Sequence, residues 1–166
     1  EFTKPIIGYL GTIEERVDID LIVKIAKHHS DKKIALCGPI WPGIKKELHE
    51  KIKGIENIHT FGRIDFDDAP SYLNKFNVAI IPHKLNKFVE SMNPMKMYDY
   101  LACGKPVVAT QGAGIDMFKD HIYIAKSENE FISNIDQALL EDSPEKREAR
   151  KAAVKQHSWR ERTDKM

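Results

Sequence analysis

A lysine and an aspartate, Lys96 and Asp99, lie three residues apart in a segment whose pattern predicts a helix. Side chains at this spacing share one helix face, so a single ligand can contact both. An ammonium group suits a phosphate, and a carboxylate can accept two hydrogen bonds from a vicinal diol such as ribose. The pair therefore has the chemistry to bind a nucleotide.

The helix that carries this pair has clear start and stop signals. Asn93 is predicted as its N-cap and Pro94 as its first residue, and Gly104 is predicted to end it. The free N–H groups of the first turn favour a diphosphate. Lys96 in that turn opposes the helix dipole, which favours a functional role. The alternative is an amphipathic helix with a solvated Lys96–Asp99 pair, and spacing alone favours that alternative.

Short apolar runs alternate with longer helical patterns along the chain, as in βαβ units around a parallel sheet. The runs are nearly uniformly apolar, which is typical of strands covered on both faces. Right-handed crossovers would wind them into an α/β, Rossmann-like doubly wound sheet of about six strands. The predicted strands are residues 5–10, 33–37, 58–61, 78–82 and 106–109, with a weaker one at 122–125.

Helical patterns follow the strands. Their predicted apolar stripes are Ile19, Ile22, Val23 and Ala26; Ile44, Leu48 and Ile52; Tyr72, Leu73 and Phe76; and Met95, Tyr98, Leu101 and Ala102. The tail adds residues 131–140 and a charged helix from Ser143 or Pro144 to about residue 156, with Ser143 as a reasonable N-cap. No repeat, low-complexity stretch or linker divides the chain, so residues 1–166 are expected to form a single domain.

Ligands of a doubly wound sheet lie beyond the carboxyl ends of the strands, so the residues after each strand matter most. Gly11 and Thr12 belong to a Gly-x-x-Gly turn after the first strand, whose small residues could let backbone amides approach an anion. A tight turn that needs glycine for steric reasons is at least as good an alternative. Neither GxxxxGK[ST] nor GxGxxG follows the first strand, which weakens a kinase-like or dinucleotide-binding interpretation.

Composition sets broad limits. The chain has 166 residues, with 26 Lys and Arg against 25 Asp and Glu, so its charge does not suggest a nucleic-acid or membrane-surface partner. Cys37 and Cys103 lack metal-ligand spacing and are expected to be small buried hydrophobic residues in a reducing compartment. No signal peptide or apolar run of about 20 residues is evident, which predicts a cytoplasmic protein. The two ends of the sequence suggest an excised domain.

One long stretch resembles a known family. The run D-Y-L-A-C-G-K-P-V-V-A-T at residues 99–110 is similar to the signature of GT-B glycosyltransferases of the large retaining family four. The run P-M-K-M-Y-D-Y-L-A at residues 94–102 is closer still to the P-x-K-x-Y-[ED]-Y-L-A form of a subset of bacterial surface-polysaccharide enzymes. Further matches follow in order: G-Y-L-G-T-I at Gly8, V-D-I-D-L-I at Val17, L-C-G-P at Leu36, N-I-H-T-F-G-R at Asn57 and Y-L-N-K-F-N-V-A-I-I-P at Tyr72.

The resemblance implies the donor-binding, C-terminal half of a GT-B enzyme, without its N-terminal acceptor domain. The donor would be a nucleoside diphosphate sugar, with UDP or GDP as the nucleotide. A hexose-type sugar would pass to a glycan or lipid-linked acceptor in polysaccharide biosynthesis, with peripheral membrane association of the full enzyme. No metal is expected, because helix amides and basic side chains stabilise the departing diphosphate. Catalytic residues are expected outside this chain.

The resemblance also assigns roles to single residues. Asp99 takes the position of the carboxylate that binds the ribose hydroxyls, and Ser91 takes that of a second carboxylate, eight residues earlier, that contacts the transferred sugar. Arg63 and Ile64 are expected at the base. The remaining candidates for the nucleotide-sugar site are Gly38 and Pro39 near the same pocket, Met92, Asn93, Pro94 and Lys96 near the diphosphate, and Arg16, which is otherwise a solvated residue beside Glu14 and Glu15.

Other functions and residues remain open at this point. The alternatives are a GT-B nucleotide-sugar epimerase half, a non-catalytic nucleotide-binding module and a receiver-type signalling domain, whose phosphorylatable aspartate and lysine are missing from the expected places. His83 follows the fourth strand, but a lone histidine is more often structural. The pair His28–His29 is expected on a solvated helix face. Trp41 either lines the cleft or packs, and Trp159 resembles a tryptophan of the closing helix in GT-B proteins.

Overall fold

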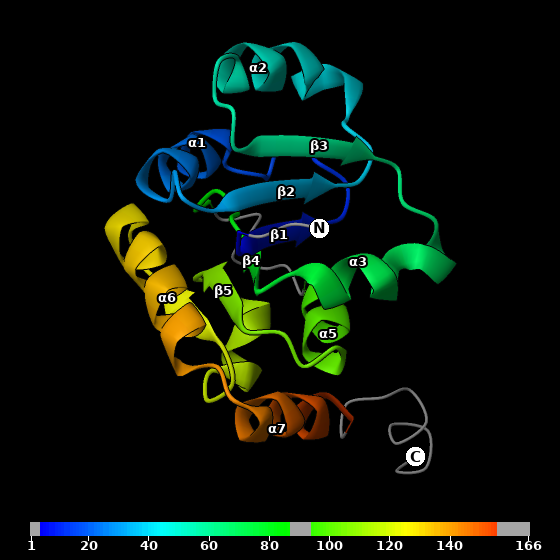
Figure 1. Ribbon diagram of the computed structural model, residues 1–166, viewed down its shortest axis with the longest axis vertical. Coiled ribbons are helices and arrows are strands. Elements are labelled where there is room, and N and C mark those ends of the chain that lie inside the picture. The colour runs from blue at the N-terminus through cyan, green and yellow to red at the C-terminus, as the bar shows by residue number, and fades with distance from the viewer. Residues whose placement is uncertain (1–3, 87–93, 156–166) are drawn as a thin grey trace.

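The computed structural model describes residues 4–86 and 94–155 and shows one parallel sheet flanked by helices (Figure 1). The strand order is β3-β2-β1-β4-β5-β6, so the order reverses between β1 and β4. The strands are β1 (Ile6–Leu10), β2 (Lys33–Cys37), β3 (Ile58–Gly62), β4 (Val78–Ile81), β5 (Val107–Thr110) and β6 (Tyr123–Ala125). Each predicted strand is present, with its ends within one residue of the prediction. The doubly wound α/β fold is confirmed.

The same strand order decides against a receiver-type domain. A receiver-type sheet runs in the order 2-1-3-4-5, with the third strand beside the first. Here β1 lies between β2 and β4, and β3 is at the edge beyond β2. The receiver-type alternative therefore does not fit this fold.

The helices cover the two faces of the sheet in separate groups (Figure 1). Helices α1 (Ile19–His28), α2 (Pro42–Ile52) and α6 (Glu128–Glu141) pack on one face and bury one apolar cluster. Helices α3 (Ala69–Lys75) and α5 (Met95–Ala102) pack on the other face and bury a second cluster, which the short helix η2 (Ala113–Phe118) extends. Helix α7 (Pro144–Lys155) packs against α5, and the short helix η1 (Phe66–Asp68) precedes α3.

Side-chain caps fix where the helices begin. The Asp18 carboxylate accepts a hydrogen bond from the Leu21 N–H at 2.9 Å, and the Ser127 hydroxyl accepts one from the Glu130 N–H at 3.2 Å. Such caps satisfy backbone donors that the first turn of a helix leaves free. Ser143 accepts a bond from the N–H of the third residue beyond it, which confirms its predicted role as the N-cap of α7.

Two details of α5 correct the sequence-based prediction. Pro94 is the N-cap, with an extended backbone (φ −73°, ψ 106°), so the helix begins at Met95 and not at Pro94. The predicted N-cap, Asn93, lies outside the described residues. The predicted apolar stripe is right at Leu101, which is buried, and in part at Tyr98, which packs partly buried against the core, but Met95 and Ala102 are exposed. The buried side chains of α5 are Met97, Tyr100 and Leu101, and the face that carries Lys96 and Asp99 borders a cavity.

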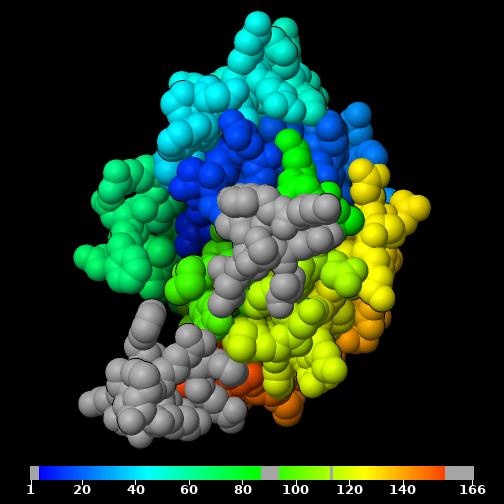
Figure 2. All heavy atoms as spheres, turned by 180° about the vertical axis from the view of Figure 1, so that it is seen from behind, coloured from blue at the N-terminus to red at the C-terminus, as the bar shows by residue number. Residues whose placement is uncertain are grey.

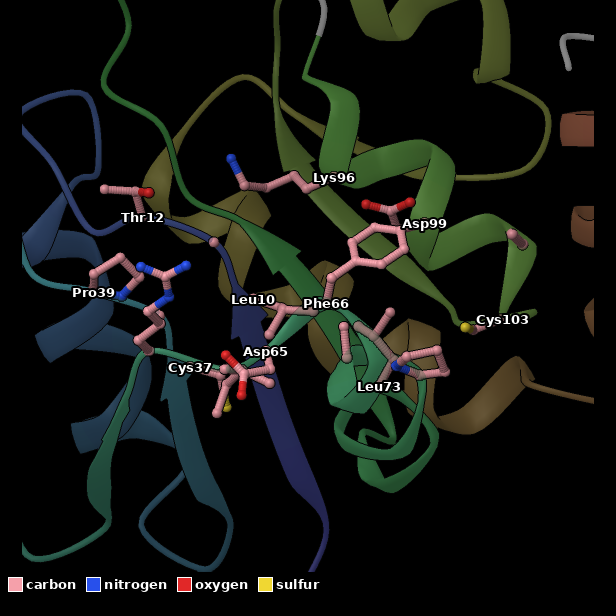
Figure 3. Close-up of a pocket in the computed structure, with 17 residues that line it drawn as sticks. Leu10, Thr12, Cys37, Pro39, Asp65, Phe66, Leu73, Lys96, Asp99 and Cys103 are labelled. Carbon is pink, nitrogen blue, oxygen red and sulfur yellow. The ribbon is translucent and has the colours of Figure 1, made fainter. Parts of the chain in front are cut away.

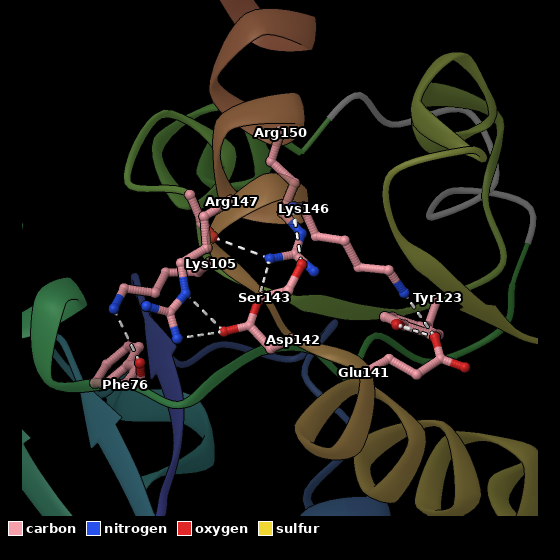
Figure 4. Close-up of polar contacts among 10 residues, drawn as sticks. Phe76, Lys105, Tyr123, Glu141, Asp142, Ser143, Lys146, Arg147 and Arg150 are labelled. Carbon is pink, nitrogen blue, oxygen red and sulfur yellow. Dashed lines mark hydrogen bonds and ion pairs between the residues drawn. The ribbon is translucent and has the colours of Figure 1, made fainter.

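The turn that joins α5 to β5 is fixed by partners from two other helices (Figure 4). Gly104 ends the helix with φ +69°, as predicted. The buried Arg150 of α7 donates hydrogen bonds to the Gly104 carbonyl at 3.1 Å and to the Asp142 carboxylate at 2.7 Å. The Lys105 ammonium donates to the carbonyls of Asn74 at 2.9 Å and Phe76 at 3.1 Å at the end of α3. The Gly-Lys-Pro sequence after α5 therefore holds helices together.

No described helix combines the length and the apolar composition needed to cross a membrane. Cys37 is buried, as predicted, but Cys103 is not. Cys103 is only partly buried and borders the cavity beside α5, so the expectation of a fully buried side chain is wrong for it.

Candidate functional site

A pocket of about 600 Å³ opens at the carboxyl edge of the sheet, beside the reversal of strand order. Its walls come from the turns after β1, β2 and β3, from η1 and α3, and from α5. Figure 2 shows the molecule from behind, with the green segment of η1 and α3 projecting beside the blue N-terminal part of the chain. Ligands of doubly wound sheets bind at this kind of place.

Eight of the predicted site residues line this pocket together: Gly11, Thr12, Gly38, Pro39, Arg63, Ile64, Lys96 and Asp99. They come from four segments of the chain that the strand order brings to one edge. Arg16 and Pro94 do not line the pocket. Ser91, Met92 and Asn93 lie outside the described residues, so their predicted roles stay predictions.

Glycines allow two turns to interlock under the pocket. The Gly11 N–H donates to the Cys37 carbonyl at 2.8 Å, and the Gly38 N–H donates to the Gly62 carbonyl at 2.7 Å. Gly38 has φ +145°, and a Cβ at this position would lie 2.0 Å from the Gly11 carbonyl oxygen. Only glycine fits there. The Gly11 amide is occupied by a protein carbonyl, which favours the steric interpretation of the Gly-x-x-Gly turn.

Lys96 and Asp99 project from α5 into the pocket, across from Thr12 and Pro39 (Figure 3). The predicted sharing of one helix face is confirmed. The Lys96 ammonium lies 5.3 Å from the centre of the buried Tyr9 ring. A Cβ on Gly11 would lie 2.8 Å from Lys96 Cε, so the lysine stem passes directly over this glycine. The turn after β1 thus leaves room for a cation at the pocket wall.

Lys96 and Asp99 both have pKa values shifted from their ordinary range. Burial and, to a smaller extent, the nearby Arg16 charge together lower the pKa of Lys96 to about 8. Burial raises the pKa of Asp99, although the Lys96 charge opposes that shift. Among residues 4–86 and 94–155, no hydrogen bond or ion pair satisfies the Lys96 ammonium. A ligand anion would relieve this, because a neighbouring negative charge favours the protonated lysine.

Arg16 lies in the neighbourhood of Lys96 but does not line the pocket. Its guanidinium pairs with the Glu14 carboxylate and is partly buried. Its charge lowers the pKa of both Lys96 and His83, so the three basic side chains share one neighbourhood. Its predicted role at the diphosphate stays a prediction.

His83 is buried and uncharged. Burial and, to a smaller extent, the charges of Lys96 and Arg16 together lower its pKa to about 3. Its Nε2 atom has no hydrogen-bond partner in the described part of the chain. The side chain borders a separate hollow with Thr110 and Ser127 and does not enter the pocket beside α5. Trp41 is exposed and does not line the pocket either, and Trp159 lies outside the described residues.

Sequence reasoning missed most of the apolar lining. Asp65 and Phe66 follow the predicted Arg63–Ile64 contact, and the Phe66 side chain is 90% exposed. The sequence signal that could have predicted Phe66 was its position shortly after Arg63 and Ile64, which were already predicted to contact the base. The first helical residues of α3 complete this wall, and Leu10, Cys37, Ala69, Pro70, Leu73, Ala102 and Cys103 are the remaining residues that the sequence did not assign to the site. Ala102 and Cys103 lie within the run that resembles the family signature, so this run borders the pocket as well as the core.

The model of the family described as "Glycosyl transferases group 1" matches residues 4–142. The chain belongs to this family. Sequence and fold agree on that assignment, since the described sheet has the Rossmann-like form of one half of a GT-B glycosyltransferase.

Relatives and solved structures extend the comparison. The chain is 27% identical over 105 residues to the putative teichuronic acid biosynthesis glycosyltransferase TuaH of Bacillus subtilis, covering 63% of this chain and 26% of that protein. The C-terminal domain of the group 1 protein LpcC from Francisella tularensis has a TM-score of 0.67 at 20% identity, covering 91% of this chain and 83% of that chain. HepE of Anabaena, solved with UDP and glucose, has a TM-score of 0.72 at 16% identity, covering 92% of this chain and 44% of that chain. The chain spans about a quarter of its curated relative.

Proposed function

We propose that this chain is the donor-binding domain of a glycosyltransferase and holds a nucleoside diphosphate sugar in the pocket beside α5. The observation that carries the proposal is the pair Lys96 and Asp99 on one helix face, over a cavity of about 600 Å³. Solved structures with the same fold give support, since HepE was solved with UDP-glucose and TarM of S. aureus with UDP. The nucleotide is UDP or GDP.

Each part of the ligand has a matching wall. The Asp99 carboxylate accepts hydrogen bonds from the ribose hydroxyls, because a carboxylate offers two acceptor oxygens. The diphosphate lies against Lys96 and the start of α5, in the positive field of Arg16. The base lies by Arg63 and Ile64, where the exposed Phe66 ring offers an apolar surface. Gly11, Thr12, Gly38 and Pro39 close the opposite wall.

The chemistry that this domain supplies is stabilisation of the leaving group. When the bond between the sugar and the diphosphate breaks, negative charge grows on the departing diphosphate. The Lys96 ammonium and the N–H groups at the start of α5 stabilise that charge in place of a metal ion. Lys96 is held in position over Gly11 before the ligand arrives, so little reorganisation is needed. The catalytic groups that act on the acceptor belong to another domain.

That other domain faces the carboxyl edge of the sheet. Large apolar side chains stand exposed in the segments beyond the carboxyl ends of the strands: Trp41, Phe66, Leu85, Met95 and Met117. Exposed apolar groups gathered in one region mark interaction surfaces. The full-length enzyme therefore pairs this domain with an N-terminal acceptor domain across the pocket. It transfers a hexose-type sugar to a glycan or lipid-linked acceptor in polysaccharide biosynthesis, in the cytoplasm at the inner face of the membrane.

Calorimetric titration of the chain with UDP, GDP and ADP tests the donor-binding proposal. We expect one site, with Asp99→Ala and Lys96→Ala each weakening binding by at least about tenfold, as a lost charge-assisted hydrogen bond predicts. Lys46→Ala, an exposed lysine of α2, is the matched control and should bind like the parent. Saturable binding that ignores both pocket substitutions would show that the nucleotide lies elsewhere. Donor hydrolysis by the chain joined to its upstream domain then separates a transferase from a non-catalytic nucleotide-binding module.

A further inference from the structure

Two consecutive histidines at the end of α1 converge on one carboxylate of α6. His28 is the last residue of α1, and His29 follows it with a non-helical backbone (φ −100°, ψ 52°). Successive side chains of a regular helix point about 100° apart. Because the helix ends at His28, the His29 side chain can lie close to that of His28. The two imidazole rings lie edge to face with centroids 4.9 Å apart, and both lie near Asp136. The expectation of a solvated pair is wrong for His29, which is 2% exposed.

The distances in this cluster suit a shared cation better than direct hydrogen bonds. His29 Nδ1 lies 3.5 Å from Asp136 Oδ1, and His28 Nε2 lies 4.0 Å from Asp136 Oδ2. Good N–H···O bonds span about 2.7–3.2 Å, so neither imidazole makes one with this carboxylate. Two atoms bound to one tetrahedral zinc ion lie about 3.4 Å apart. One ligand atom from each of the three residues lies within 4.8 Å of the others, so small side-chain rotations would close the set.

We propose that His28, His29 and Asp136 form a binding site for a divalent transition-metal ion of the zinc type. Two imidazoles and a carboxylate are a common donor set for zinc, with a fourth position left to water. The ion would join the end of α1 to the middle of α6. This position is at the amino edge of the sheet, since the chain passes from it directly into the start of β2, and the nucleotide pocket is at the carboxyl edge.

The surroundings favour metal binding because the three ligands differ in exposure. The His29 ring is only 2% exposed, so the surrounding protein holds it in place. His28 and Asp136 are each more than half exposed, so an ion can enter from solvent. The cluster thus combines one fixed ligand with two accessible ligands.

Hydrogen bonds hold the backbone of the fixed ligand in place. The Asn57 side-chain amide donates to the carbonyls of Ala26 at 2.9 Å, His29 at 3.1 Å and Lys32 at 3.1 Å. A second link between the two helices is the ion pair of Lys24 with Glu128. These contacts hold the end of α1 and the facing part of α6 together without the ion. The site is therefore a link between helices that are already docked.

Metal titration of the chelator-treated chain tests the site. Calorimetry with ZnCl₂ should show one ion bound per chain, and added zinc should raise the midpoint of thermal unfolding. CoCl₂ should give the visible absorption bands of cobalt in a low-symmetry nitrogen and oxygen site. His28→Ala and Asp136→Asn, both at exposed positions, should each weaken zinc binding by at least about tenfold and abolish the thermal shift. His49→Ala, an exposed histidine of α2, is the control and should bind zinc like the parent.

Two results would overturn the metal site. One is zinc affinity that is unchanged in both His28→Ala and Asp136→Asn. The other is the absence of saturable binding with up to a tenfold molar excess of zinc at micromolar protein. Titration of the same variants with UDP keeps this test separate from the proposed function, because the two sites lie at opposite edges of the sheet and loss of one leaves the other measurable.

Discussion

Lys96 lies in the first turn of α5 and Lys105 in the turn that follows this helix, and the two lysines differ in their hydrogen bonds. Burial lowers the pKa of both lysines. Lys105 donates to two carbonyls at the end of α3, whereas the Lys96 ammonium makes no hydrogen bond within the described residues and faces a cavity. A buried cation that is hydrogen-bonded stabilises the fold, whereas one that has no hydrogen bond among the described residues is available for a ligand. Lys96 is therefore the lysine that marks the ligand site.

The largest expected loss of stability comes from the ion pair that holds the turn after α5. Asp142→Ala leaves the buried Arg150 guanidinium without its carboxylate and removes a partner of Arg147. Breaking a buried ion pair costs about 3–5 kcal/mol of unfolding free energy. Denaturant unfolding measures the loss, with Asp120→Ala, an exposed carboxylate, as the control. The folded fraction should bind UDP like the parent, and weaker binding would contradict the separation of the two ends of α5.

A somewhat smaller loss is expected where the ligand wall is itself part of the fold. Gly38→Ala places a methyl group 2.0 Å from the Gly11 carbonyl oxygen, at φ +145°. Backbone strain and overpacking together should cost about 3 kcal/mol. Gly54→Ala is the matched control, because Gly54 also has positive φ (+79°) but no atom within 4 Å of the added methyl group, and it should cost about 1 kcal/mol. Equal losses for the two variants would show that the interlocked turns do not matter.

The paired variants Lys96→Met and Lys105→Met test the comparison directly. Methionine keeps the length of the side chain without its charge. Lys96→Met should raise the unfolding free energy by about 2 kcal/mol at pH 7, because a charge that burial disfavours is gone. It should also abolish measurable UDP binding. Lys105→Met should lower stability by about 1–2 kcal/mol, because the carbonyls of Asn74 and Phe76 lose their donor, and should leave UDP binding intact. Thermal melts and calorimetry report both properties, and the reverse pattern would refute the assignment.

The smallest effect is a dependence of binding on pH. Lys96 has a pKa of about 8 in the folded chain, below its value of about 10.4 when unfolded. Between these values the unfolded chain binds more protons, so the contribution of Lys96 to stability rises with pH. Nucleotide binding changes in the opposite direction, because the diphosphate needs the charged lysine. UDP affinity should fall about tenfold from pH 7 to pH 9 in calorimetric titrations. In Lys96→Ala any remaining affinity should not change in this range.

Sequence alone predicted the fold well because the signals for it are local. Apolar runs of strand length give the six strands, and caps such as Ser143 give helix starts. The facing of Lys96 and Asp99 also follows from helix geometry alone. The start of α5 was misplaced because proline fits both the N-cap and the first helical turn, and only the observed ψ of Pro94 distinguishes them.

The rest of the site depends on contacts between distant segments. Phe66 and Leu73 reach the pocket only because β3 and the crossover through α3 bring them across from α5, and no periodicity encodes that distance. The Arg16 charge lowers the pKa of Lys96 although Arg16 does not line the pocket. The sequence did not predict this proximity, because the nearby Glu14 and Glu15 suggest only local ion pairs for Arg16. The convergence of His28 and His29 depends on the end of α1 falling between them.

The buried Tyr100 hydroxyl joins the binding helix to the end of the first strand. It accepts a hydrogen bond from the Leu10 N–H at 2.8 Å and donates one to the Leu10 carbonyl at 3.1 Å. The helix that bears Lys96 and Asp99 is thereby locked to the strand that leads into Gly11 and Thr12. Two facing walls of the pocket are thus joined before the nucleotide arrives, so binding does not require them to dock first. Association with the described part of the site should accordingly be a single fast phase, limited by diffusion and orientation rather than by rearrangement.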